Sequence, residues 1–126
     1  MFENMRELMD QSATIQKEAR DDLAYYLEKS IKSNLEIIVL SMLMECPMCG
    51  YDLIKDIFEK YNVFLSQGTV YPLLYSLKND GLLQAQFARG NTRTKIYSIT
   101  EYGEDIVKGK INDFIQVEEY ILDIIR

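Results

Sequence analysis

Between Ser66 and Thr100 the sequence combines hydrogen-bonding side chains with cations and contains a single carboxylate. Apolar residues recur there at intervals of three and four, which predicts a helix with one buried side; they are Val70, Leu73, Leu74 and Leu77. The other positions are polar or aromatic, namely Ser66, Gln67, Thr69, Tyr71, Tyr75, Ser76, Lys78 and Asn79. Such a face can hydrogen-bond to base edges in a DNA major groove without repelling the phosphates.

A basic turn follows this predicted helix. Gly81 is placed to end the helix. Beyond it, apolar residues alternate with polar ones on both sides of a turn at Arg89–Arg93, which predicts a β-hairpin; the apolar ones are Leu83, Ala85, Phe87, Tyr97 and Ile99. Arg89 and Arg93 lie at the predicted tip with Lys95 nearby, so the hairpin carries three cations suited to phosphate contacts.

The net charge of −6 would oppose DNA binding if it were spread evenly along the chain. Residues 1–30 carry 4 basic and 7 acidic side chains, residues 31–100 carry 7 and 6, and residues 101–126 carry 3 and 7. Within the middle block, Ser66–Thr100 has four basic side chains against Asp80 alone. The predicted helix and hairpin are therefore the basic region of an acidic chain.

Composition excludes several functional classes. A chain of 126 residues, 48% hydrophobic and 27% charged, fits one globular domain. It contains no histidine, which removes histidine acid–base catalysis and the commonest zinc ligand, so we expect no enzyme, cofactor or metal site. No apolar run approaches the roughly 20 residues of a membrane span, and the first four residues are too polar for a signal peptide. A cytoplasmic location is expected.

Cys46 and Cys49 are the two cysteines of the chain, in a Cys-x-x-Cys spacing. Two thiolates at this spacing can close a disulfide or supply two of the four ligands of zinc. The other interpretation is that both are incidental, partly buried thiols that pack as small hydrophobic groups. Both interpretations stay open on the sequence.

The segments on either side of the Ser66–Thr100 region are predicted to be helical. Apolar residues from about Met5 to Ile31 predict one long amphipathic helix, either packed on its own domain or reaching a second subunit. Ser33 to Glu36 match a capping box, which predicts the start of a second helix. The body of this helix, residues 37–44, is apolar all round, so we expect it at the centre of the domain.

A third helix from Tyr51 to Tyr61 is expected to end at Asn62. Core packing is the first explanation for the tyrosines Tyr26, Tyr51, Tyr61 and Tyr97. For the polar helix, Pro72 favours Thr69 over Ser66 as the N-cap.

The last helix is predicted to begin after the cap Thr100 and to carry a coiled-coil-like apolar stripe. A monomer of this size has little left to cover that stripe, so we expect a homodimer that uses this helix together with the first one. The residues expected at the interface are Leu8, Ile15, Leu23, Val107, Ile111, Phe114, Ile121, Leu122 and Ile125.

Three strings of the sequence stand out, namely Cys46-Pro47-Met48-Cys49-Gly50-Tyr51-Asp52-Leu53-Ile54, Leu65-Ser66-Gln67-Gly68-Thr69-Val70-Tyr71-Pro72-Leu73-Leu74 and Ile96-Tyr97-Ser98-Ile99-Thr100-Glu101-Tyr102-Gly103. They resemble the corresponding strings of the PadR family of transcriptional regulators. The resemblance implies a dimeric winged-helix repressor, with a small hydrophobic or aromatic effector in some members. Tyr75 and Ser76 stand where relatives often carry arginine, so phosphate contacts are expected to depend on Lys78 and the hairpin.

The predicted fold is mainly α with a small β-hairpin, a winged helix-turn-helix. We divide it into an N-terminal dimer arm (1–32), a DNA-binding winged helix (33–100) and a C-terminal dimerisation helix (101–126). The expected function is sequence-specific binding of double-stranded DNA by a homodimer that represses transcription. The alternatives are a winged-helix adaptor that binds proteins, which the acidic charge would fit, and a redox-responsive regulator that uses Cys46 and Cys49.

Overall fold

The structure is a computed structural model that describes the backbone of residues 2–126 and the side chains of residues 5–11 and 21–126. Its elements, in chain order, are α1 (Phe2–Ser33), α2 (Leu35–Glu45), β1 (Met48–Cys49), α3 (Gly50–Tyr61), α4 (Gln67–Asn79), β2 (Leu83–Ala88), β3 (Asn91–Ile99) and α5 (Glu101–Ile125). They form two compact units, Met1–Ser33 and Asn34–Arg126. None of the helices described has both the length and the hydropathy to cross a bilayer.

The first unit is the single helix α1. Its 32 residues confirm the long helix that the apolar spacing predicts. The side chain of Ile15, a predicted interface residue, lies outside the described residues. Leu8 and Leu23 are 63% and 70% exposed.

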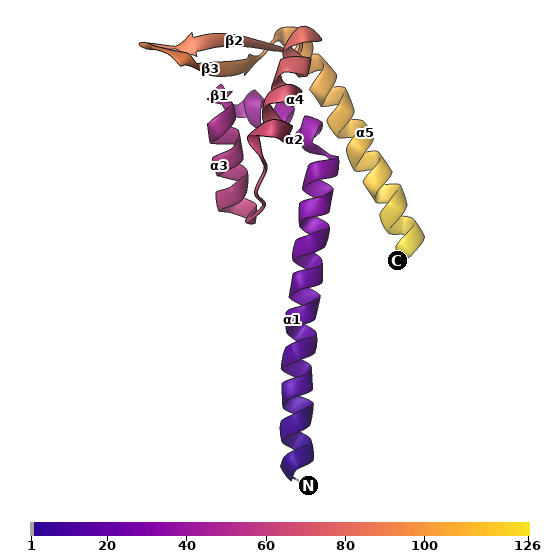
Figure 1. The fold of residues 1–126 in the computed structure, drawn as a ribbon. Coiled ribbons are helices and arrows are strands. Elements are labelled where there is room, and N and C mark those ends of the chain that lie inside the picture. Colours follow the sequence, from indigo (N-terminus) through magenta and orange to yellow (C-terminus); the bar gives the residue numbers. More distant parts are fainter. Residues whose placement is uncertain (1) are drawn as a thin grey trace. The chain divides into compact units, whose positions relative to one another are not determined.

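The second unit is the predicted winged helix, with α2, α3 and α4 followed by the β2–β3 hairpin, which extends as an arm beside the helices (Figure 1). Its core is built from the helices and the loop before α4; the most deeply buried large side chains are Val39, Leu40, Leu53, Ile57, Leu65, Val70, Leu74 and Val107. Every residue from Ile37 to Met44 is at least half-buried, which confirms that α2 is the central helix.

A third strand, which the sequence analysis missed, attaches the hairpin to the helices. Met48 pairs with Tyr97 and Cys49 with Ile96 in antiparallel register, so the sheet order is β1-β3-β2. The segment between α2 and α3 is therefore a structural connection to the hairpin as well as a helix break. Two residues are too few for a periodic pattern to reveal a strand.

Two local predictions are wrong. Ser33 ends α1, Asn34 is the N-cap of α2 without a side-chain cap hydrogen bond, and Glu36 accepts a hydrogen bond from Lys110 of α5 at 2.6 Å, so no capping box forms. Ser66, and not Thr69, is the N-cap of α4, which leaves Pro72 inside the helix. The amide that Pro72 lacks would have bonded to the carbonyl of the exposed Gly68, so the missing bond costs little.

The core packing expected for Tyr51 and Tyr61 is also wrong. Tyr51 and Tyr61 are 62% and 52% exposed, and the side chains buried from α3 are Leu53, Ile54 and Ile57. At 100° per residue, this buried face lies about 70° around the helix from the apolar line formed by Tyr51, Ile54, Phe58 and Tyr61. Tyr26 is 65% exposed, so Tyr97, at 7%, is the only one of the four tyrosines that packs in the core. Asn62 ends α3, as predicted, and the structure shows it in a left-handed conformation.

Candidate nucleic-acid interface

The outward face of α4 consists of the side chains that the sequence predicted. Val70, Leu74 and Leu77 are buried, and Leu73 is half-buried. The predicted contact residues are all exposed; they are Ser66, Gln67, Thr69, Tyr71, Tyr75, Lys78 and Asn79. Tyr75 is 64% exposed and points away from the core. At the start of the helix, the hydroxyl oxygens of Ser66 and Thr69 are 3.0 Å apart, so the two side chains hold each other in place.

Tyr71 is 39% exposed, less than Tyr75 at 64%, and it lies against the first residue of α3. A Cβ atom at Gly50 would collide with the Tyr71 ring, so only glycine allows this contact. Burial, and next the proximity of Tyr71, raise the pKa of the Tyr97 hydroxyl on β3. Tyr71 thus joins α4 to α3 and the sheet, and sequence reasoning missed the role of Gly50, whose only signal was its place in the family-like string.

The hairpin tip is tighter than predicted. Ala88 pairs with Asn91 across the two-residue turn Arg89–Gly90, and a register shift separates this pair from Phe87. Gly90 has a φ of 76°, a conformation that glycine adopts without strain. Asn91 organises the turn because its Nδ2 donates to Thr94 Oγ1 and its Oδ1 accepts from the Arg93 amide, both at 2.9 Å. The two arginines extend from an ordered turn.

The cations of this region have no carboxylate partners among the side chains that the structure describes. Among the residues whose side chains are described, the ion pairs are Lys32–Glu28, Lys55–Glu59 and Lys110–Glu36. None of them involves Lys78, Arg89, Arg93 or Lys95, and all four of these side chains are exposed. Lys95 Nζ instead lies 5.8 Å from the centre of the Phe87 ring. The positive charges are therefore free to meet phosphates.

Thr100 fixes the hairpin to the helices on both sides of it. Its hydroxyl donates to the Gly81 carbonyl at 2.7 Å and accepts from the Gly103 amide at 2.9 Å, which caps α5 as predicted. Gly81 has a φ of 82° and ends α4 in the left-handed conformation that was expected. Gly103 must be glycine, since a Cβ atom there would collide with the Leu82 carbonyl. The end of α4, the hairpin and the start of α5 are thereby held together.

The two cysteines are free thiols, with Cys46 exposed and Cys49 half-buried. Both have extended backbone angles, and Cys49 belongs to β1, which pairs with β3. A disulfide between them would need Cα atoms within about 7 Å of each other, and the pairing of Cys49 with Ile96 of β3 fixes one end of this segment. In the described part of the chain, no cluster of three or more acidic or cysteine side chains could hold a metal ion.

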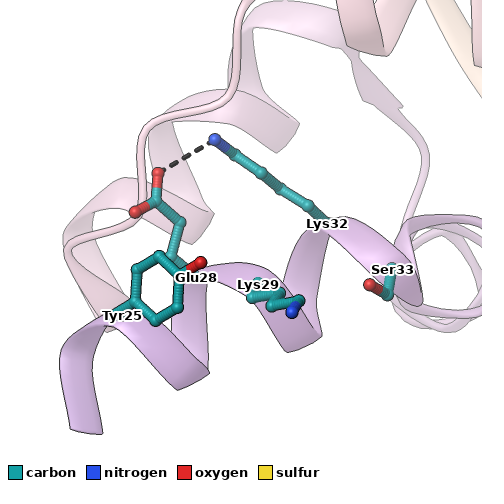
Figure 2. A pocket seen from close by; sticks show the side chains of 5 residues that line it. All are labelled: Tyr25, Glu28, Lys29, Lys32 and Ser33. Atoms are coloured by element: carbon teal, nitrogen blue, oxygen red, sulfur yellow. Dashed lines mark hydrogen bonds and ion pairs between the residues drawn. The ribbon is translucent and has the colours of Figure 1, made fainter. Parts of the chain in front are cut away.

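A shallow hollow lies along α1. It is lined by Tyr25, Glu28, Lys29, Lys32 and Ser33, and Figure 2 shows the Lys32–Glu28 ion pair across it. The two charged atoms are 2.9 Å apart. All five residues come from one helix, so the hollow is open and gives a small molecule little enclosure.

Comparison with known proteins agrees with this geometry. The model of the transcriptional regulator PadR-like family matches residues 39–108, more than half of the chain. The chain belongs to the PadR-like family. The match spans α3, α4, the hairpin and the start of α5, so the winged helix of this PadR-like regulator is the part that carries the family pattern. As a member, the chain is a DNA-binding transcriptional regulator.

Solved structures give the same fold. A PadR-like transcription factor from Bacteroides fragilis is 27% identical, with a TM-score of 0.65, covering 79% of this chain and 98% of its own. A PadR family regulator from Eggerthella lenta is 24% identical, with a TM-score of 0.71, covering 86% and 96%. The second likeness supports the fold alone. No protein of curated function matches the chain.

Proposed function

We propose that this PadR-like regulator is a homodimeric, sequence-specific repressor that places α4 in the major groove and the hairpin on adjacent phosphates or in the minor groove. The observation that carries the proposal is the set of four exposed cations without carboxylate partners in the described structure, beside a helix face that has no carboxylate. In a chain with a net charge of −6, this region is where positive charge is concentrated, so DNA phosphates would meet least repulsion there.

The residues divide into two roles. Gln67, Thr69, Tyr75 and Asn79 would contact base edges or orient the helix, with Ser66 holding Thr69 and Tyr71 holding the helix against α3. Lys78, Arg89, Arg93 and Lys95 would contact phosphates. Phosphate contacts fix orientation but read no sequence, so specificity would come from the first group.

Dimerisation would rest on α5. Along the predicted stripe, Val107 is fully buried and Ile111 is half-buried, but Ile121 is 44% and Ile125 is 70% exposed. The stripe thus continues past the end of the domain that covers its first part. A second copy would cover the rest, and two recognition helices would then meet successive major grooves. The exposed Leu8 and Leu23 of α1 fit a contribution from the first helix.

Competition binding tests the reading role. We expect Asn79→Ala and Tyr75→Ala to reduce the preference for DNA from upstream of the protein's own gene over mixed-sequence competitor, and Lys78→Ala to weaken both equally. Lys60→Ala on α3 is the matched control. If Asn79→Ala and Tyr75→Ala leave the preference intact, α4 is not the reading element.

The adaptor hypothesis predicts a different result. A winged helix that binds only proteins would show no salt-dependent affinity for either DNA at low ionic strength, whereas a regulator would bind both and release them as salt rises. An effector remains a prediction from the family resemblance.

A further inference from the structure

Phe87 is a large aromatic side chain that the core does not use. It lies on the same hairpin face as Leu83, and the burial of this face declines toward the tip, from 3% exposed at Leu83 to 57% at Phe87. An aromatic ring left this exposed gains little from burial. Its one described ring contact is with Lys95, the residue directly opposite it on β3.

The contact has the geometry of a cation–π pair. The Lys95 ammonium lies 5.8 Å from the ring centre, within the range of about 6 Å over which the ring quadrupole attracts a cation. Lysine has four rotatable bonds and loses considerable rotamer freedom when its ammonium is held in one place. The ring limits that freedom before any phosphate arrives.

We propose that Phe87 is a positioning residue for DNA binding, which holds the Lys95 ammonium on the hairpin where it can meet a phosphate. This inference rests on the proposed DNA-binding function. Phe87 contacts the phosphate only through Lys95, and a register shift lies between this pair and the Ala88–Asn91 pair that closes the turn. The hairpin thus offers two kinds of cation, namely the two arginines near its tip, Arg89 and Arg93, and one lysine held on a ring.

A mutant cycle on a mixed-sequence DNA duplex tests the proposal, because phosphate contacts require no operator. Phe87→Leu keeps an apolar side chain of similar size but removes the ring, and it should weaken binding by about 2- to 5-fold, the effect of an exposed cation–π pair. In the Lys95→Gln background the same change should have no effect. Phe87→Trp should bind at least as tightly as the unmodified protein.

Other outcomes would overturn the inference. Unchanged binding by Phe87→Leu would show that the ring holds nothing, and equal weakening with and without Lys95 would show that the ring contacts DNA itself. Thermal unfolding of each variant separates an effect on binding from an effect on folding. If Phe87→Leu folds poorly, Phe87→Trp still tests the proposal, because weaker binding by this variant would contradict it. Loss of binding in Arg89→Ala, Arg93→Ala tests the proposed function separately, so the two proposals can fail independently.

Discussion

The exposed end of the α5 stripe leads to a quantitative prediction about dimerisation. Ile121 and Ile125 lie on the continuation of the stripe that begins at the buried Val107, and they are 44% and 70% exposed in the single chain. Full burial of an isoleucine stabilises by about 1.5–3 kcal/mol, so covering these fractions in both chains contributes roughly 3–7 kcal/mol to the dimer. The double change Ile121→Ser, Ile125→Ser should therefore raise the dimer dissociation constant by about 10²- to 10⁵-fold.

The same helix provides a matched control. Val117 and Ile124 are 52% and 80% exposed, but they lie about 80–100° around the helix from the stripe. Val117→Ser, Ile124→Ser removes a similar exposed apolar area and should leave the dissociation constant close to that of the unmodified protein.

Sedimentation equilibrium over a concentration series measures both variants, and thermal unfolding confirms that each is folded. Equal effects of the two double variants would show that the stripe is not the interface. An unmodified protein that stays monomeric at the highest concentration reached would refute the homodimer.

Three further predictions concern folding and redox state. Gly103→Ala should destabilise the protein by about 1–3 kcal/mol in urea unfolding, because its Cβ would meet the Leu82 carbonyl. Gly109→Ala, with open space around the new Cβ, should stabilise the protein by about 0.5–1 kcal/mol. Equal effects of the two changes would refute the close approach at Gly103. Burial raises the folded-state pKa of Tyr97 above its ordinary value of 10.0, so the stability that is present below that value is lost as the pH rises through the folded pKa. Tyr97→Phe should reduce the loss of stability above about pH 10, and an unchanged loss would assign it to other groups. A thiol oxidant should leave DNA affinity unchanged in both the unmodified protein and the double variant Cys46→Ser, Cys49→Ser, because the pairing of β1 with β3 holds Cys49 in the sheet. An oxidant effect that the double variant abolishes would establish the redox alternative.

Periodicity predicted the helices well because burial in this domain follows it. The positions of Val70, Leu74 and Leu77 sufficed to orient α4, and with it the exposed face that carries Tyr75 and Asn79. The left-handed glycine after α4 and the Thr100 cap were predictable because each is a local requirement of a helix end.

The errors occurred where tertiary contacts decide. Tyr51 and Tyr61 follow helical spacing as closely as Ile54 does, and only packing against α4 and the sheet determines which side of α3 is covered. Gly50 is required by a ring from another helix, and the Phe87–Lys95 pair depends on the register of two strands. Such contacts are absent from any local pattern.

Salt dependence of DNA binding tests the central claim most directly, namely that the cations of α4 and the hairpin bind DNA phosphates. Four such cations per chain, Lys78, Arg89, Arg93 and Lys95, give eight in a dimer, and at about 0.9 per phosphate the logarithmic slope of affinity against salt approaches −7. Arg89→Ala, Arg93→Ala should reduce this slope by between about 3 and 4, whereas Lys108→Ala, Arg126→Ala, with the same charge change on α5, should not alter it. A slope that the hairpin variant leaves unchanged would contradict the account.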